Sequence, residues 1–143
     1  MHDGARAVDF SRQAFGAQEL YRSAMPDGQG IHAQLRIHDS VVLVSDESMR
    51  HPELAVRAPR TLGGAGTILE LYVDDVDAVF ARAVEAGASP TLQPMDTFFG
   101  DRYSWVTDPF GHVWGLATVR EVLTPEQIDE RMQAYASQAC QAS

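Results

Sequence analysis

Two stretches of this chain carry apolar residues at the three-to-four-residue spacing of an amphipathic helix. The first covers residues 5–15, with Asp3 as a candidate N-cap and Gly16 at its end. The second covers residues 76–86 and ends at Gly87 in the same way. The pattern therefore predicts two similar helices, each preceded by an acidic residue and followed by a glycine.

Between and after these stretches the pattern becomes typical of β-strands. Residues 31–37 alternate apolar with polar side chains, as a half-buried strand does, and residues 41–44 form a short apolar run rich in β-branched residues. Further strands are predicted at 18–24, 67–73, 89–93, 102–107 and 112–118. A Pro-Asp-Gly turn is predicted within residues 25–28.

The two halves of the chain are similar in kind. Segment 3–17 has a counterpart in segment 74–88, and strands follow both at similar offsets. The second half then has the order strand, helix and three strands, or βαβββ. The equivalent first strand of the first half would end near His2, so almost all of it would precede Met1. We expect either that this module lacks its first strand or that the sequence begins late.

This repeat predicts an α+β protein with four parts. Residues 1–46 form an incomplete first βαβββ module, 47–66 a connector, 67–118 a second βαβββ module, and 119–143 a C-terminal helix and tail. The polar, proline-containing connector is a link between modules or a flap over a site. The last helix opens at Thr124 with a capping box and has no counterpart in the first half.

The composition of the chain limits the classes of partner and the compartment that we expect. The net charge of −9 and a pI near 4.8 argue against a nucleic-acid partner, which needs clustered cationic side chains. The single cysteine, Cys140, excludes a disulfide within the chain and favours a reducing compartment. No apolar run approaches the ~20 residues of a membrane span, and the N-terminus shows no signal pattern. We therefore expect a cytoplasmic protein with no membrane partner.

Several short motifs resemble the vicinal oxygen chelate superfamily, which includes glyoxalase I, extradiol dioxygenases and bleomycin-resistance proteins. The most specific are Phe-Gly-Asp-Arg-Tyr at 99–103 and Asp-Pro-Phe-Gly-His-Val-Trp at 108–114. Segments 14–17, 31–37 and 71–78 add to them, and the set resembles the PhnB-like branch in particular. The resemblance implies two cup-shaped modules facing each other around a ligand cavity.

In metal-dependent members of this superfamily, the ligands come from the first and last strands of each module. Here segment 41–45 contains no His, Asp or Glu, and Ile68 occupies the histidine position of glyoxalase I. Gly115 stands where the metal-binding glutamate is expected. Glu70 remains, one pleat after Ile68 and on the same face. The resemblance therefore predicts no metal and no cofactor. The rival hypothesis is a metal site whose ligands are Glu70 and either His32 or His112.

Glu70 is the candidate catalytic residue. It shares a strand face with the apolar parts of Ile68 and Tyr72, where a carboxylate is costly unless it is bonded or functional. The structural alternative is a solvent-facing glutamate, or one paired with Arg36 or Arg102. Both alternatives stay open from the sequence alone.

The candidate ligand-binding residues are His32, Tyr72, Phe98, Arg102, Tyr103 and Trp105. His32 shares a polar strand face with Gln34 and Arg36, and that face lines either the cavity or the exterior. Arg102 could anchor an anionic group or act as a structural clamp. The aromatic residues, with Trp114, line a pocket or belong to the core.

The favoured hypothesis is a protein of the bleomycin-resistance type that holds a small organic molecule between its modules without a metal. The alternative is a metal-dependent lyase, isomerase or dioxygenase, so whether the protein is an enzyme stays open. A catalytically inert partner protein is a third hypothesis. A homodimer is expected, because an incomplete first module exposes a strand edge that a second chain could cover.

Overall fold

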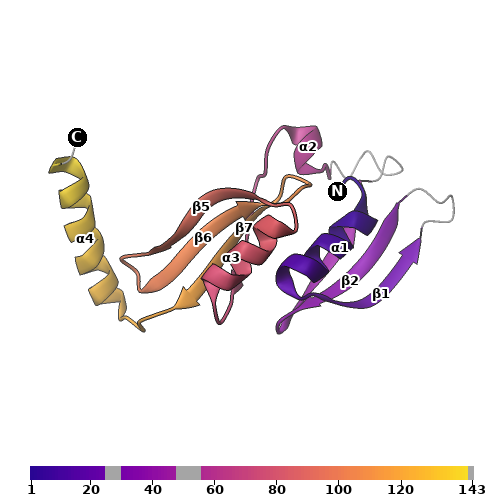
Figure 1. Cartoon of the computed structure of the whole chain (residues 1–143). Coiled ribbons are helices and arrows are strands. Elements are labelled where there is room, and N and C mark those ends of the chain that lie inside the picture. Colours follow the sequence, from indigo (N-terminus) through magenta and orange to yellow (C-terminus); the bar gives the residue numbers. More distant parts are fainter. Residues whose placement is uncertain (25–29, 48–55, 142–143) are drawn as a thin grey trace.

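A computed structural model of the chain describes residues 1–24, 30–47 and 56–141. Two β-sheets each carry a helix on one face, and the two helices pack against each other between the sheets (Figure 1). The elements are α1 (Gly4–Phe15), β1 (Gln18–Ala24), β2 (Ile31–Ile37), β3 (Ser40–Ser45), α2 (Pro59–Leu62), β4 (Ile68–Tyr72), α3 (Val76–Glu85), β5 (Ser89–Asp96), β6 (Asp101–Thr107), β7 (Val113–Val119) and α4 (Pro125–Gln141). The predicted α+β class is confirmed.

The first sheet is antiparallel and has the strand order β1-β2-β3. Ala33, Leu35 and Ile37 of β2 are almost completely buried and face α1. Strand alternation therefore turns His32 and its polar neighbours on β2 to the opposite face. The predicted turn at 25–28, which would join β1 to β2, lies outside the described residues.

The second sheet has the order β4-β7-β6-β5, in which β4 runs parallel to β7 and the other pairs are antiparallel. The order of elements along the chain, β4-α3-β5-β6-β7, agrees with the predicted strand, helix and three strands. Strand β5 extends to Asp96, beyond the predicted end at residue 93. It does so because Met95 pairs with Tyr103 and Asp96 with Arg102 across two register irregularities.

The caps of both main helices form as the sequence predicts. The Asp3 side chain accepts a hydrogen bond from the Arg6 backbone N–H at 3.2 Å. Asp75 does the same for Ala78 at 3.1 Å. Gly16 ends α1 with a φ of 67°, a left-handed conformation that glycine adopts without strain.

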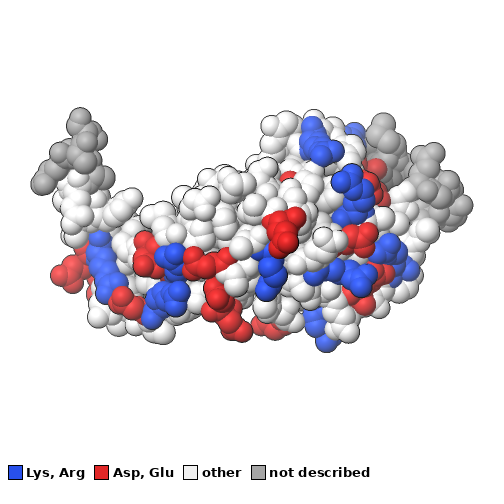
Figure 2. Space-filling model, viewed as in Figure 1, with Lys and Arg blue, Asp and Glu red and all other residues white. Residues whose placement is uncertain are grey.

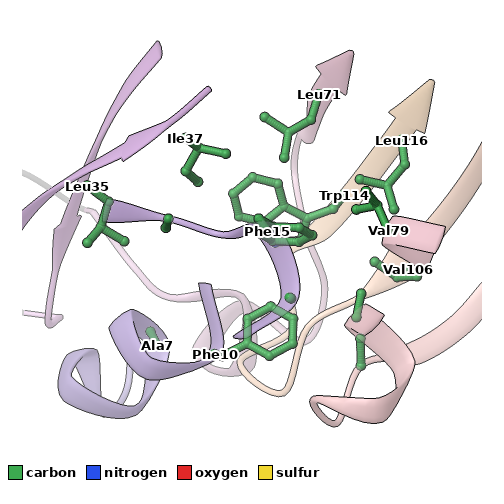
Figure 3. Packing of buried hydrophobic residues seen from close by; sticks show 14 of the residues in the cluster. Ala7, Phe10, Phe15, Leu35, Ile37, Leu71, Val79, Val106, Trp114 and Leu116 are labelled. Carbon is green, nitrogen blue, oxygen red and sulfur yellow. The ribbon is translucent and has the colours of Figure 1, made fainter. Parts of the chain in front are cut away.

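One hydrophobic core joins the two halves (Figure 3). The ring of Phe15 at the end of α1 lies 4.7 Å from the ring of Trp114 on β7, centroid to centroid. Ile37 and Leu35 lie on one side of Phe15, and Leu116 lies on the other. Trp114 is 5% exposed, so the structure assigns it to the core rather than to a pocket.

The connector region 47–66 contains a short helix that the sequence pattern did not predict. Helix α2 begins at Pro59, a favoured first helical residue, and ends at Gly63 with a φ of 77°. Residues 48–55 of the connector lie outside the described residues. The prediction that the connector is a link between the modules or a flap over a site therefore stays a prediction.

Helix α4 projects from the far end of the second sheet (Figure 1). Its capping box is confirmed: the Thr124 hydroxyl accepts from the Gln127 N–H at 3.3 Å, and the Gln127 side chain accepts from the Thr124 N–H at 2.9 Å. Tyr135 packs on Phe98 with ring centroids 5.7 Å apart. Met132 and Tyr135 are nevertheless 47% and 57% exposed, so this helix keeps an open apolar face.

Charge is spread rather than gathered on the visible face. Figure 2 shows arginines interspersed with acidic side chains along the lower part of the molecule, whereas the upper edge between α2 and α4 is largely uncharged. Of the helices in the described ranges, none has the length and apolar character needed to cross a membrane.

Candidate functional site

The open face of the second sheet holds most of the predicted site residues. On β4, Leu71 is buried toward the core, so alternation turns Ile68, Glu70 and Tyr72 to the other face. On β6, Ser104 and Val106 are completely buried, and the residues between and beside them face the same way as Glu70. We call this surface the open face.

A chain of hydrogen bonds crosses the open face. The Trp105 indole N–H donates to the Tyr103 hydroxyl oxygen at 2.7 Å. The Tyr103 hydroxyl in turn donates to Oε1 of Glu70 at 2.5 Å. We call these three residues the relay. The observed partner of Glu70 is thus a tyrosine on β6 and not one of the two predicted arginines.

Gly115 makes the relay possible. It lies on β7, between the other two strands, and pairs with Glu70 on one side and Trp105 on the other. A Cβ atom at this position would lie 2.7 Å from the Tyr103 hydroxyl oxygen and 3.2 Å from Cγ of Glu70. The family resemblance implied a metal-binding glutamate at this position. Gly115 has no side chain there, and the Tyr103 hydroxyl crosses the free space to reach Glu70.

The relay keeps its tyrosine protonated. Burial and the hydrogen bond to the Glu70 carboxylate raise the pKa of Tyr103 above its usual value near 10. A second tyrosine behaves alike: the Tyr72 hydroxyl donates to Oδ2 of Asp101 at 3.0 Å, and this bond, with burial, raises the pKa of Tyr72. Both hydroxyls therefore act as donors to carboxylates at neutral pH.

An aromatic row continues from the relay toward α4. The ring of Phe99 lies 6.0 Å from that of Tyr103, and the ring of Phe98 lies 5.3 Å from that of Phe99. Phe98 then contacts Tyr135 of α4. Most of these pairs are edge-to-face, the arrangement that aromatic side chains favour. Phe98 therefore lies two ring contacts from Tyr103.

A hollow opens on the other side of Glu70, between β4 and the turn that joins β2 to β3. Its volume is about 370 Å³. The lining residues are Ile37, His38, Asp39, Ser40, Glu70, Leu71 and Tyr72. His38 and Asp39 were not among the predicted site residues, since a two-residue turn at 38–39 carries no sequence signal of its distant neighbour β4.

Two predicted ligand-binding residues lie away from the relay. His32 is on the first sheet, where its Nδ1 and the Ser45 hydroxyl are 2.6 Å apart. Arg102 projects to the helix side of the second sheet, and its guanidinium donates to both carboxylate oxygens of Asp77, at 2.7 and 2.9 Å. A third bond reaches Asp96 at 3.2 Å. This is the geometry of the structural clamp, the alternative role for Arg102.

The donor set does not fit a divalent metal ion. Such an ion needs several N, O or S donors converging at about 2 Å. Within residues 1–24, 30–47 and 56–141, no three His, Cys, Asp or Glu side chains come together in this way. Glu70 bonds to Tyr103, and His112 of the rival set lies 3.2 Å from the Asp108 carboxylate. We therefore assign no step to a metal at the relay.

Asp108, the first residue of the motif at 108–114, accepts several hydrogen bonds that the motif alone did not reveal. Its Oδ1 accepts backbone N–H bonds from Phe110 and His112, at 2.8 and 2.9 Å. Its Oδ2 accepts the Trp114 indole N–H at 3.1 Å. Burial opposes its ionisation, but the bonds from His112 and Trp114 outweigh burial and lower the pKa of Asp108.

Comparison with known proteins places this architecture in a family. The model of the Glyoxalase/Bleomycin resistance protein/Dioxygenase superfamily matches residues 2–116. The chain belongs to this superfamily. An uncharacterised protein of Mycobacterium tuberculosis is 44% identical over 137 residues, which cover 95% of this chain and 78% of that protein.

Solved structures agree with this assignment. TioX from Micromonospora sp. ML1 is 30% identical, with a TM-score of 0.61 over 83% of this chain and 92% of TioX. Glyoxalase I from Zea mays is 19% identical, with a TM-score of 0.64 over 87% of this chain and 43% of the maize chain. The maize likeness shows the fold alone. The predicted superfamily is therefore confirmed, and the PhnB-like branch stays a prediction.

Proposed function

We propose that this superfamily member binds a small organic molecule on the open face of the second sheet, without a metal ion. The observation that carries the proposal is the relay of Glu70, Tyr103 and Trp105 over Gly115. It combines one oriented carboxylate with aromatic surface, which is the usual composition of a small-molecule site.

The state of Glu70 supports binding rather than metal chemistry. Its Oε1 accepts the Tyr103 hydroxyl, and among the described residues no side chain or backbone group donates to its Oε2. That oxygen is open to a donor from a ligand. The Tyr103 hydroxyl fixes the position of the carboxylate through Oε1 and leaves Oε2 to the ligand.

Binding can be measured through the two tryptophans. Trp105 belongs to the relay, whereas Trp114 is buried in the core, so Trp105→Phe leaves the core fluorophore in place. We expect metal-free bleomycin and planar heteroaromatic compounds to change the fluorescence of the wild type in the presence of EDTA. The same compounds should change the fluorescence of Trp105→Phe much less.

The rival function has its own test. Calorimetric titration with Mn²⁺, Ni²⁺, Zn²⁺ and Fe²⁺ should give no stoichiometric binding to the wild type. Tight binding of one ion that disappears in Glu70→Ala would favour the metal-dependent lyase, isomerase or dioxygenase instead.

A homodimer is also part of the proposal. In the described ranges β3 is an edge strand of the first sheet, and its Val41 and Leu43 are 54% and 61% exposed. An apolar edge strand of this kind is a common place for a second chain to pack. Light scattering at micromolar concentration should give twice the chain mass, and Leu43→Asp should shift the protein toward the monomer. A wild type that stays monomeric would contradict this part.

Two finer assignments complete the proposal. We assign the chain to the PhnB-like branch on the motifs at 99–103 and 108–114. We assign it to the cytoplasm because its one cysteine offers no pair for a disulfide within the chain. Fractionation of cells that produce the protein would test the second assignment.

A further inference from the structure

The charges on the open face have one sign. Glu70 and Asp101 project from β4 and β6, and Asp39 lies across the hollow from Glu70. The arginine nearest in sequence to the relay, Arg102, is on the helix side and bonded to Asp77 and Asp96. Among the described residues no arginine lines the hollow, and the chain contains no lysine. A ligand at Glu70 therefore meets carboxylates with no arginine or lysine beside them, and His38 is the one basic side chain among the residues that line the hollow.

The hydrogen-bond donors of the open face are already used. The Trp105 N–H donates to Tyr103, the Tyr103 hydroxyl donates to Glu70, and the Tyr72 hydroxyl donates to Asp101. The face therefore presents acceptors: Oε2 of Glu70 above all. An anionic ligand would have to break one of these three bonds to use a donor of the open face, whereas a ligand with N–H groups would break none.

The surface around Glu70 is aromatic. Tyr72 is 60% exposed, and the rings of Tyr103 and Trp105 lie 6.2 Å apart at an angle of 75°. Flat rings pack well on such surfaces, and a cation above an aromatic face gains further attraction from the ring quadrupole. The carboxylates, the occupied hydrogen-bond donors and the aromatic side chains around Glu70 thus favour the same chemical class of ligand.

We propose that the open face selects a planar aromatic cation that carries N–H donors, such as a protonated amidine on a fused ring. Its N–H groups donate to Glu70, and its ring packs against Tyr72 and Trp105. This inference rests on the proposed small-molecule function and names the ligand class for that site.

Three probes that share one ring system separate charge from shape. Naphthalene-2-carboxamidine is cationic, naphthalene-2-carboxamide is neutral, and naphthalene-2-carboxylate is anionic. We measure their affinities by calorimetry for the full chain at low and at physiological salt. The amidine should bind at least about tenfold more tightly than the carboxylate at both salt concentrations, since a charge-assisted pair contributes about that much.

Matched variants assign the selectivity to one carboxylate. Glu70→Gln should weaken amidine binding about tenfold and leave carboxamide binding nearly unchanged. Glu85→Gln, which removes the same charge from an exposed site on α3, should change neither affinity. If Glu85→Gln weakens the amidine as much as Glu70→Gln does, the attraction comes from net charge and the inference is wrong.

The outcomes also separate this inference from the proposed function. If all three probes bind equally and lose affinity together in Trp105→Ala, the site binds small molecules and the preference for cations is refuted. If none of the three binds, both the inference and the proposed function fail. If only the amidine depends on Glu70, both are supported.

Discussion

Gly115 shows how one missing side chain sets the chemistry of a site. The family resemblance implied an acidic metal ligand at this position, and a glycine there leaves room for the Tyr103 hydroxyl to meet Glu70. The sequence shows that a carboxylate is absent but gives no sign of what fills its place. That information comes from strand order, which brings β4 and β6 to either side of β7.

The variant Gly115→Ala tests this role at the residue scale. The added Cβ would lie 2.7 Å from the Tyr103 hydroxyl oxygen, so the relay must open. We expect a loss of about 1–2 kcal/mol in the free energy of unfolding, measured with urea, and weaker ligand binding. Gly64→Ala is the control. Apart from Gly64 and its two chain neighbours, no atom of the described residues lies within 4 Å of the place its methyl group would take, so the change should alter stability by less than about 0.5 kcal/mol. Equal effects at the two glycines would contradict the role of Gly115.

Two buried hydroxyls offer a second contrast. Ser104 is completely buried, and its hydroxyl has no hydrogen-bond partner among the described residues. The Thr118 hydroxyl accepts from the Val76 N–H and donates to the Val73 carbonyl, both at 2.9 Å. Ser104→Ala should therefore leave stability unchanged or raise it by up to about 1 kcal/mol, whereas Thr118→Val should lower it by about 1–3 kcal/mol. Chemical denaturation measures both, and a costly Ser104→Ala would reveal a partner for its hydroxyl.

At the scale of elements, the turn between β6 and β7 depends on Asp108. This buried carboxylate accepts N–H bonds from Phe110 and His112 before β7 and from the indole of Trp114 on β7. The Asp-Pro-Phe-Gly sequence at 108–111 is typical of a β-turn. It does not predict that the same aspartate holds the indole of Trp114 in the core.

The lowered pKa of Asp108 makes this turn sensitive to acid. Its contribution to stability is fully present above the ordinary aspartate pKa of 3.8, and it is lost as the pH falls through the lower pKa of the folded protein. Asp108→Asn should destabilise the protein by about 2–3 kcal/mol at neutral pH. Urea denaturation of both proteins at a series of pH values should show this difference shrinking below pH ~4. A difference that stays constant into acid would exclude the charge as its cause.

At the scale of the whole molecule, the two sheets share one core. The pair of Phe15 on α1 and Trp114 on β7 spans the two halves, and α1 packs against α3 (Figure 3). The halves therefore have no separate hydrophobic interior. Because of this, they should fold and unfold together.

Phe15→Ala tests this shared core. Removing a ring that is 4% exposed should cost about 3–5 kcal/mol. Far-ultraviolet circular dichroism and Trp114 fluorescence, recorded in the Trp105→Phe background, should still report one coincident transition at a lower urea concentration. Two separate transitions in the parent protein would show that the halves are independent.

Most helices and strands of this protein could be predicted from the sequence alone, because the interactions that form them are local. Helix spacing, acidic caps, closing glycines and strand alternation act over a few residues, so α1, α3 and most strands are predicted close to their observed bounds. Ends that depend on pairing are less well predicted, as the longer β5 shows. The family motifs likewise identified the superfamily.

Only the tertiary structure decided what the candidate residues do. Glu70, Tyr103 and Gly115 are far apart in sequence and meet because β4 pairs with β7 in parallel while β6 pairs with its other edge. The same pairing sends Arg102 to Asp77 on the helix side and Trp114 into the core. A side chain's partner depends on which strands lie next to each other and on which face it occupies, and neither is encoded in the residues that flank it.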